Sequence, residues 1–422
     1  MKIIAVVLFA LMYVLMIAKP RYRPFYALSV AGIFLISGIL PLNDLVPTIN
    51  WNVLLMIAGT MIIVYYFIDS RMPNLLADIL LGKSKNVMGV TILMSLFAGV
   101  ISAFIDNVAT VLMVAPVGMA ICKKLKMSPV GMILSIAVSS NLQGAATLVG
   151  DTTSIMLGDY ANMTFMNFFW MNGRPGIFFA VELGALATIP VMMFLFRKDK
   201  APVSSTERTA VSNYVPTIML LLMVAVLIIA SFIPDTPQTI NGIICCSLAI
   251  VTILIDCIQK KKTNNAIAAI KNLDFETLGL LTGLFIVIGG LTNVGIIDDF
   301  ANLIVTVGGN NIFLLYTIVV WGSVLISAFV DNIPYVATML PVLTAVTDTL
   351  GIEPYLLYFG LLSGATLGGN ITPIGASANI AAVGLLRKEG YQVSFTEFMR
   401  IGLPYTLVAV MTGYLYFWFV WA

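Results

Sequence analysis

The sequence predicts an all-α polytopic membrane protein built from two inverted-topology repeats. Three observations support this fold class: a very apolar composition, apolar runs of bilayer-crossing length along the whole chain, and a pattern of residues that recurs after 225 positions. About 60% of the 422 residues are hydrophobic and 10% are charged, whereas a soluble domain carries roughly 25% charged residues. We expect each repeat to contain about five transmembrane helices plus one re-entrant hairpin, with one of the helices broken.

The charged residues are few and nearly balanced. The chain has 22 Lys and Arg against 20 Asp and Glu, a formal charge of +2, so we expect no nucleic-acid partner. It has no histidine, which excludes His-ligated metal sites, Ser-His nucleophiles and histidine proton relays. Any proton or ion chemistry must therefore use carboxylates, hydroxyls, amides or the backbone.

A helix that crosses a bilayer needs about 20 mostly apolar residues. Runs of this kind predict spans near 3–18, 24–41, 51–68, 175–196, 214–232, 240–258, 275–293 and 402–421. Two longer runs, 129–170 and 354–386, are interrupted and predict broken helices. We predict that the stretches 88–122 and 311–347 each enter the membrane and return to the side on which they started, as re-entrant hairpins. The alternative is that each makes two full crossings with a turn at the far surface.

The basic residues orient these segments. Lys and Arg accumulate on the cytoplasmic side of membrane proteins, and with an external N-terminus only Lys2 and Arg174 of the 22 basic residues fall outside. We therefore predict an integral protein of the cell (inner) membrane with both termini external. A polar stretch divides the chain into a first repeat (1–200), a cytoplasmic linker (201–213) and a second repeat (214–422).

The internal repeat is the most informative feature. The segment SAFIDNVATVLMVAPV (102–117) matches SAFVDNIPYVATMLPV (327–342), and Asp106 corresponds to Asp331 because 331 − 106 = 225. Without a gap, the same shift aligns Asn107 with Asn332, Thr147 with Thr372 and Gly150 with Gly375. Since each half has an odd number of crossings, the halves must run in opposite directions. Inverted repeats of this kind are typical of secondary transporters.

Two acids lie at the turns of the predicted hairpins. An ionised Asp at bilayer depth costs several kcal/mol unless it is paired, hydrated or bound to a cation. We therefore predict that Asp106 and Asp331 supply ligands for Na⁺ or a proton, with a possible Na⁺ at each. If the hairpins are instead full crossings, the two acids are solvated turn residues.

The interrupted runs contain NLQGAATLVGDTTS (141–154) and GATLGGNITPIGASAN (364–379). Helix breaks at membrane depth are tolerated only around a cavity. Half-helix N-termini there suit an anion and freed carbonyls suit Na⁺; packing of small residues is the alternative. The predicted substrate- and ion-binding residues are Asp106, Asn107, Asn141, Gly144, Thr147, Gly150, Asp151, Thr152, Thr153, Asp331, Asn332, Asn370, Thr372, Pro373, Gly375, Ser377 and Asn379.

Two further acids do not follow the repeat. Asp151 corresponds to Ala376, so the first break is the more negative one; this asymmetry suggests a cation half-site in the first repeat and an anion half-site in the second. Glu182 lies inside the predicted span 175–196, where proton coupling and interfacial packing are both open.

The pairing of F-[IV]-D-N tips with a G-x-x-T-x-x-G break in each half resembles the ion transporter superfamily. Its members include arsenite permeases, the melanosomal P protein, a class of sodium/proton antiporters, and citrate and dicarboxylate carriers. FIDNVATVLMVAPV, GAATLVGDTTSIM and NITPIGASANI are similar to the arsenite permease and P protein branch. The resemblance implies a homodimer and an elevator-type movement. Dicarboxylate carriers differ in carrying Ser-Asn-Thr at both tips.

We therefore expect a secondary active transporter that moves a small inorganic or organic anion, of the citrate/dicarboxylate or arsenite type. Its expected partners are the substrate and the lipid bilayer, and it needs no cofactor beyond Na⁺ or H⁺ as coupling ion. A sodium/proton antiporter is the alternative. An intramembrane aspartyl protease fits less well, because Leu148 disrupts its G-x-G-D pattern. A passive channel is disfavoured because no pore-lining ring recurs across several helices.

Overall fold

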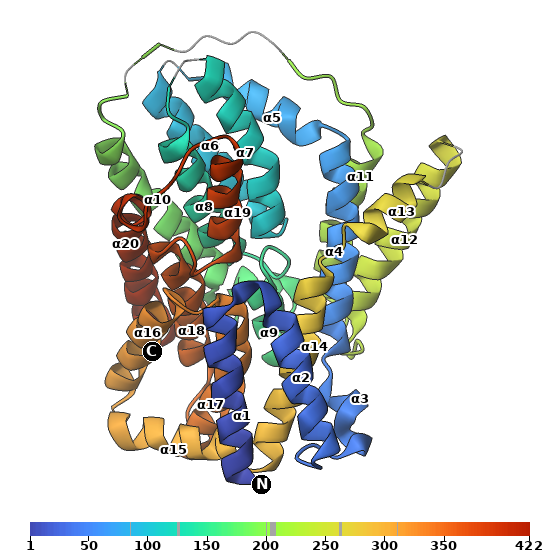
Figure 1. Cartoon of the computed structure of the whole chain (residues 1–422), viewed down its shortest axis with the longest axis vertical. Coiled ribbons are helices and arrows are strands. Elements are labelled where there is room, and N and C mark those ends of the chain that lie inside the picture. The colour runs from blue at the N-terminus through green and yellow to red at the C-terminus, as the bar shows by residue number, and fades with distance from the viewer. Residues whose placement is uncertain (85, 125–126, 200, 203–207, 261–263, 310) are drawn as a thin grey trace.

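The computed structural model consists almost entirely of helices (Figure 1). It describes residues 1–84, 86–124, 127–199, 201–202, 208–260, 264–309 and 311–422. Seven helices in these ranges are long and apolar enough to cross a membrane. They are α4 (Trp51–Asp69), α7 (Asn107–Lys124), α10 (Ile177–Leu195), α12 (Ile240–Lys260), α14 (Phe275–Asn293), α17 (Asn332–Leu350) and α20 (Phe395–Trp421).

The remaining elements connect or flank these helices. In the first half they are α1 (Lys2–Ala18), α2 (Arg23–Ile36), α3 (Leu45–Thr48), α5 (Met72–Leu81), α6 (Val87–Ser102), α8 (Val130–Gly144), α9 (Thr152–Tyr160) and the two-stranded hairpin β1 (Trp170–Met171) and β2 (Arg174–Pro175). In the second half they are α11 (Val215–Ala230), α13 (Asn264–Lys271), α15 (Ile296–Gly308), α16 (Ile312–Ser327), α18 (Tyr355–Gly368) and α19 (Ser377–Lys388). Four short 3₁₀ turns complete the chain.

Most observed helices coincide with the predicted spans, and α14 has the predicted bounds. The span predicted at 24–41 ends early at Ile36, because the following turn places Gly38 at a positive φ of 72°, a conformation that glycine adopts readily. The last span begins at Phe395 instead of 402, since Ser394 caps an amphipathic first turn. The interrupted runs are α8 followed by α9 and α18 followed by α19.

Helix boundaries recur with the spacing found in the sequence. Helices α6, α7, α8 and α9 begin at residues 87, 107, 130 and 152, and α16, α17, α18 and α19 begin at 312, 332, 355 and 377, each 225 residues later. Helices α4 and α14 begin at 51 and 275, a shift of 224. The same local signals, such as the Asn86 and Asn311 caps of α6 and α16, start the same elements in both halves.

The two helix pairs α6–α7 and α16–α17 lie at opposite ends of the molecule and point their turns toward its middle (Figure 1). Lys2 at the start of α1 forms an ion pair with Asp299 of α15 at 2.6 Å, so the N-terminus and α15 share one end. Of the linker predicted at 201–213, residues 201–202 and 208–213 lie toward the opposite end (Figure 1), and residues 203–207 lie outside the described ranges.

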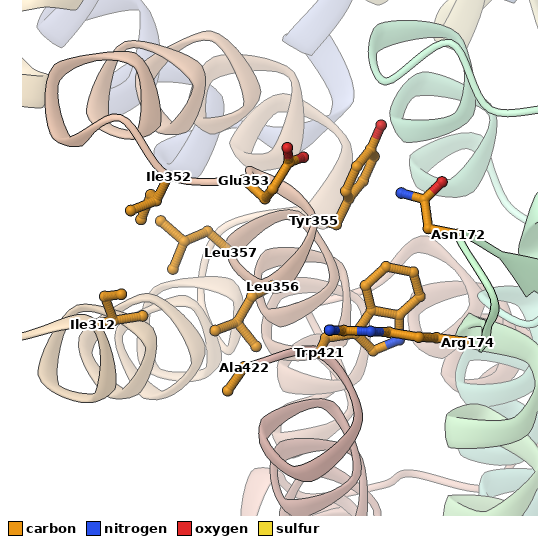
Figure 2. A pocket seen from close by; sticks show the side chains of 10 residues that line it. All are labelled: Asn172, Arg174, Ile312, Ile352, Glu353, Tyr355, Leu356, Leu357, Trp421 and Ala422. Atoms are coloured by element: carbon orange, nitrogen blue, oxygen red, sulfur yellow. The ribbon is translucent and has the colours of Figure 1, made fainter.

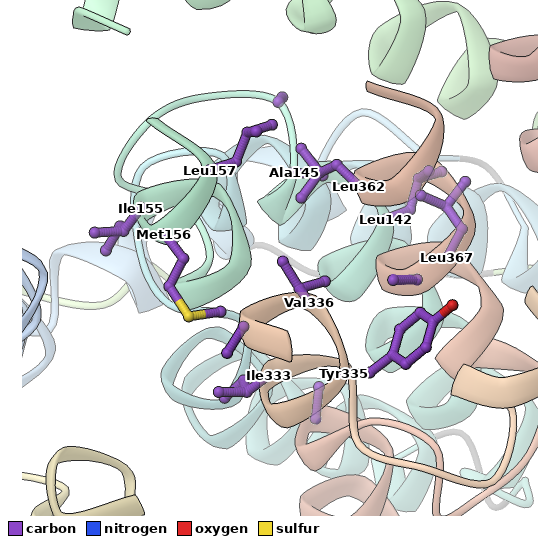
Figure 3. Close-up of a cluster of buried hydrophobic side chains, with 14 of the residues drawn as sticks. Leu142, Ala145, Ile155, Met156, Leu157, Ile333, Tyr335, Val336, Leu362 and Leu367 are labelled. Carbon is purple, nitrogen blue, oxygen red and sulfur yellow. The ribbon is translucent and has the colours of Figure 1, made fainter. Parts of the chain in front are cut away.

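The core joins the two halves directly. Met156 of α9 points toward Ile333 of α17 in a cluster of buried apolar side chains that also contains Ile155, Leu157 and Val336 (Figure 3). Helix α9 follows the first break, while α17 belongs to the second hairpin. This packing, which removes apolar surface from contact with water, brings both breaks and both hairpin turns into one region.

Candidate functional site

The break between α8 and α9 and the break between α18 and α19 are each hydrogen-bonded to the hairpin turn of their own half. The Thr147 hydroxyl donates to the carbonyl oxygen of Ala103, and the Thr372 hydroxyl donates to that of Ala328. These two contacts are related by 225 residues at both ends. All four residues are buried, so the hydrogen bonds satisfy carbonyls that the end of the hairpin helix leaves without helical partners.

Glycine allows the chains to approach closely at the same points. A Cβ added to Gly150 would lie 2.6 Å from the Ser102 carbonyl oxygen, and one added to Gly375 would lie 2.7 Å from that of Ser327. These distances are too short for any other residue, so both positions require glycine. The G-x-x-T-x-x-G pattern therefore marks where a broken helix crosses a hairpin turn.

The halves meet at Asn141. Its side-chain nitrogen donates to the Thr366 carbonyl oxygen at 2.7 Å, and 366 − 141 = 225, so two equivalent positions contact each other. Equivalent residues touch in this way only near an axis that relates the two halves. The same Asn141 nitrogen also donates to Asn370 at 3.1 Å, and Asn370 donates to the Val138 carbonyl at 3.0 Å.

A small cavity of about 40 Å³ lies where the turns and breaks converge. Its lining contains Asp106 and Asn107 from the first turn, Asn332 from the second, and Ser377 from the start of α19. It also contains the polar residues Thr60, Asp151, Thr152, Asp274 and Thr277. One water needs about 10–15 Å³, so the cavity has room for an ion with little water.

Three carboxylates face this cavity, and the described residues that line it include no Lys or Arg. One oxygen of Asp106 accepts the backbone N–H groups of Val108 and Ala109 at 3.0 and 3.1 Å. Asp274 caps α14 and accepts from the backbone and hydroxyl of Thr277 at 2.9 and 2.6 Å. The described residues include no group of three or more Cys, Asp or Glu suited to a metal, so a cation here would also need amide, hydroxyl or carbonyl oxygens.

The first turn is tied into a hydrogen-bonded network. The Asn107 side-chain nitrogen donates to Asn141 at 2.8 Å and to Asp151 at 3.4 Å. Asp151 also accepts the hydroxyl of Thr153 at 2.6 Å, which in turn contacts Thr366 across the halves at 3.0 Å. Because Asp151 is 2% exposed, this network holds its carboxylate in place beside the cavity.

The second turn has a different partner. Asp331 forms an ion pair with Arg23 of α2 at 2.8 Å, and the two side chains are 2% and 12% exposed. The same carboxylate oxygen of Asp331 accepts the Ser377 hydroxyl at 3.0 Å. Next to this pair, the Tyr13 hydroxyl donates to the Pro334 carbonyl oxygen at 2.7 Å. The α1–α2 pair is thus attached to the second turn by a buried salt bridge.

Asn332 is the equivalent of Asn107 but lacks its bonds. Its side-chain nitrogen is buried, makes no hydrogen bond to the described residues and belongs to a residue that lines the cavity. Both acceptors of Asn107 are replaced in the second half, Asn141 by Thr366 and Asp151 by Ala376. Neither α9 nor α19 has a side-chain cap hydrogen bond, but a carboxylate precedes α9 at Asp151 whereas the uncharged Ala376 precedes α19. The second half thus presents unsatisfied donors where the first half presents a carboxylate.

The predicted site residues fall into two groups. Those that line the cavity are Asp106, Asn107, Asp151, Thr152, Asn332 and Ser377. Those that lie behind it, in the breaks and their hydrogen bonds, are Asn141, Gly144, Thr147, Gly150, Thr153, Asp331, Asn370, Thr372, Pro373, Gly375 and Asn379. Glu182 lies on α10 and does not line the cavity.

Sequence reasoning missed three polar cavity residues and one ion-pair partner: Thr60, Asp274, Thr277 and Arg23. The repeat contained a signal for Asp274, since the 224-residue shift aligns it with Asn50, and both residues cap the helix that follows. Arg23 was assigned only a role in orientation, as one of several basic residues in a loop. Nothing in its local sequence distinguishes it from Arg21.

A larger cavity of about 470 Å³ lies elsewhere, at the ends of α18 and α20 (Figure 2). One of its sides is apolar, with Ile312, Leu356 and Leu357, and Arg174 lies over the ring of Trp421 at its other side (Figure 2). Neither hairpin turn nor either break contributes to it. It is therefore separate from the site described above.

Curated relatives match almost the whole chain. An uncharacterized transporter of Mycobacterium tuberculosis, Rv2684, is 29% identical over 99% of this chain and 98% of its own length. The 46 kDa membrane protein of Mycobacterium leprae has the same identity and coverage. The P protein of Sus scrofa is 26% identical over 98% of this chain and 59% of its own length. These relatives confirm the resemblance to the ion transporter superfamily.

Solved structures show the same fold at low identity. The YdaH transporter of Alcanivorax borkumensis superposes with a TM-score of 0.59 at 14% identity, over 89% of this chain and 86% of that one. MtrF of Neisseria gonorrhoeae, from a class of antimetabolite efflux pumps, gives 0.56 at 16% identity, over 87% and 80%. A family model described as citrate transporter matches residues 13–362 and 268–422. The chain is therefore a membrane transporter that belongs to the citrate transporter family.

Proposed function

We propose that the chain is a secondary active transporter that couples a monovalent cation to a small anion through the cavity between the two hairpin turns. The observation that carries this proposal is the composition of the cavity at the junction of two helix breaks. It combines three carboxylates with the side-chain nitrogen of Asn332, which has no hydrogen-bond partner in the described part of the chain. Carboxylates attract cations, and free amide donors attract oxygens of an anion.

The cation belongs at the first turn. Asp106 and Asp151 both line the cavity, and no basic side chain of the lining neutralises them. Leaving such charges at bilayer depth without a counter-charge is costly. A Na⁺ held by the carboxylates and nearby hydroxyls, or a proton on one carboxylate, removes that cost. Asp331 is already paired with Arg23, so the proposed exchangeable cation is assigned to Asp106.

The substrate belongs at the second turn. The N-terminus of α19 carries partial positive charge that no capping side chain offsets, and the Asn332 amide adds a buried donor beside it. An oxyanion or carboxylate group satisfies both. Because three acids surround it, an anion enters only with a cation bound. The description of the family, citrate transporter, makes citrate the first substrate to test.

We also propose that the two halves, 1–200 and 214–422, are inverted repeats whose hairpins are re-entrant. The burial of Asn107 and Asn332, at 5% and 3% exposed, and their shared cavity support turns that end in the middle of the membrane. The two hairpins extend from opposite ends of the molecule toward its middle (Figure 1), which supports an inverted relation between the two repeats. An elevator movement of α6–α9 and α16–α19 within a homodimer, with both termini external, completes the proposal.

Uptake by reconstituted vesicles tests the function. Purified protein in proteoliposomes should accumulate radiolabelled citrate when a Na⁺ or proton gradient is imposed, and Asp106→Asn should abolish this accumulation. Arsenite and phosphate serve as competing substrates, and Arg174→Gln, far from the cavity, serves as the matched control. Accumulation that persists in Asp106→Asn, or that needs no cation gradient, would contradict the proposal.

A sodium/proton antiporter is the second candidate. It is favoured by one observation, the excess of acidic over basic side chains around the cavity. It predicts that a Na⁺ gradient drives proton movement, detected with a pH-sensitive dye, when no organic or inorganic substrate is present. Proton movement that requires citrate would instead support symport.

A further inference from the structure

Resting on the proposed cation site at Asp106, we infer that Arg23 is a built-in cation that occupies the equivalent position at Asp331. The two repeats then contain two cation positions, of which one is filled by a covalently attached guanidinium and one by an exchangeable ion. Arg23 would thereby set the number of cations coupled to each transport cycle.

The equivalence of the two turns is close. Asp106 and Asp331 both precede a hairpin helix, and each accepts the backbone N–H two residues later, from Val108 at 3.0 Å and from Ile333 at 3.1 Å. These bonds leave the other oxygen of each carboxylate available. In Asp331 that oxygen contacts Arg23 and Ser377, whereas in Asp106 it accepts no hydrogen bond from the described residues.

The position of Arg23 also has an equivalent in the other half. A Cβ on Gly283 would meet the backbone nitrogen of Leu28 at 2.8 Å, and a Cβ on Gly59 would meet that of Cys246 at 2.6 Å. Gly59 and Gly283 are equivalent by the 224-residue shift, so the segments that they contact, in α12 and α2, are equivalent too. Leu28 then corresponds to Cys246, a shift of 246 − 28 = 218 residues, and the same shift makes Arg23 correspond to residue 241. That residue is Asn241, which is uncharged.

The difference in charge has a direct consequence. A guanidinium is always protonated and holds a carboxylate through directed hydrogen bonds, so Asp331 requires no ion from solution. Asn241 carries no charge, and no residue of α12 lines the cavity with Asp106. At these two equivalent positions the halves therefore differ by one positive charge, which is the charge of one coupled Na⁺ or H⁺.

Arg23→Gln tests the inference by creating a second exchangeable site. Purified protein in nanodiscs is measured for ²²Na⁺ bound per chain and for protonated carboxyl groups by infrared difference spectroscopy. Arg23→Gln should bind one more cation than wild type, as Na⁺ or as a proton, and Arg23→Lys should bind the same number as wild type. An unchanged cation count in Arg23→Gln would overturn the inference.

The neutral pair Arg23→Gln/Asp331→Asn keeps the inference testable even if Arg23→Gln alone does not fold. It should bind the same number of cations as wild type, since both charges of the built-in pair are gone. One cation fewer would show that Asp331 holds an exchangeable ion in the wild-type protein, contrary to the inference. Asp106→Asn separately tests the proposed function, because it should lose one cation whatever Arg23 does.

Discussion

The two hairpin turns have nearly the same sequence and backbone contacts, yet they have different electrostatic partners. Asp106 lies beside Asp151 and Asp274 at a cavity without basic residues, whereas Asp331 is neutralised by Arg23. The amide of Asn107 is bonded to Asn141 and Asp151, whereas the amide of Asn332 has no described partner. The proposed half-sites of opposite preference rest on this difference within a duplicated framework.

The largest expected effect distinguishes the two aspartates by stability. Asp331→Asn leaves Arg23 as an uncompensated buried charge, which should lower the free energy of unfolding by about 3–5 kcal/mol. Thermal unfolding in detergent should show a lower midpoint than wild type, with the midpoint restored in Arg23→Gln/Asp331→Asn. Equal midpoints for Asp331→Asn and wild type would show that the salt bridge is absent in the membrane protein.

Asp106→Asn should instead lose function while remaining folded. Removing a charged ligand weakens an interaction by about 1.5–3 kcal/mol, so cation affinity should fall by roughly 10- to 150-fold. Titration of uptake or of thermal stability with Na⁺ and with pH measures this change. Arg174→Gln, which lies at the separate larger cavity, is the control. Wild-type cation affinity in Asp106→Asn would remove the functional difference between the turns.

Substitution of the two glycines in the helix breaks should have similar effects, because both halves make the same close backbone contacts there. Gly150→Ala and Gly375→Ala each push a Cβ into a carbonyl oxygen, and overpacking of this kind costs about 1–3 kcal/mol. Both variants should therefore unfold at similarly reduced temperatures. A large difference between them would mean that the breaks are not structurally equivalent.

The smallest expected effect concerns the unpartnered amide. Asn332→Ala removes one donor to the substrate, a loss of about 1.4 kcal/mol, or roughly a 10-fold rise in the half-saturating substrate concentration. Cation affinity should stay unchanged. Asn107→Ala, at the equivalent position, should weaken cation binding instead, because it frees Asp151 and Asn141. The same change in both parameters for both variants would contradict separate half-sites.

The sequence was sufficient for the framework. The predicted hairpin stretches 88–122 and 311–347 contain α6–α7 and α16–α17, and the predicted broken runs contain α8–α9 and α18–α19. The 225-residue shift recurs in their starting residues because helix starts depend on local signals that the duplication preserved. The sequence also predicted six of the residues that line the cavity. From the repeat alone, Asp106 and Asp331 would be expected to respond alike to substitution.

What the sequence did not indicate depends on contacts between distant segments. Arg23 reaches Asp331 across 308 positions, and Asp274 lines the same cavity as Asp106, from which 274 − 106 = 168 positions separate it. Such contacts arise from the packing of helices and have no short-range pattern. The buried salt bridge between Arg23 and Asp331 could therefore be identified only from the structure.

The most direct test of separate half-sites is the charge movement that follows a rapid increase in Na⁺ or proton concentration over proteoliposomes adsorbed to a solid-supported membrane. Wild type and Arg23→Gln/Asp331→Asn should both give a transient current, because the exchangeable cation binds at the first turn. Asp106→Asn should give none. A current that persists in Asp106→Asn and disappears in Arg23→Gln/Asp331→Asn would contradict the assignment of the coupled cation to Asp106.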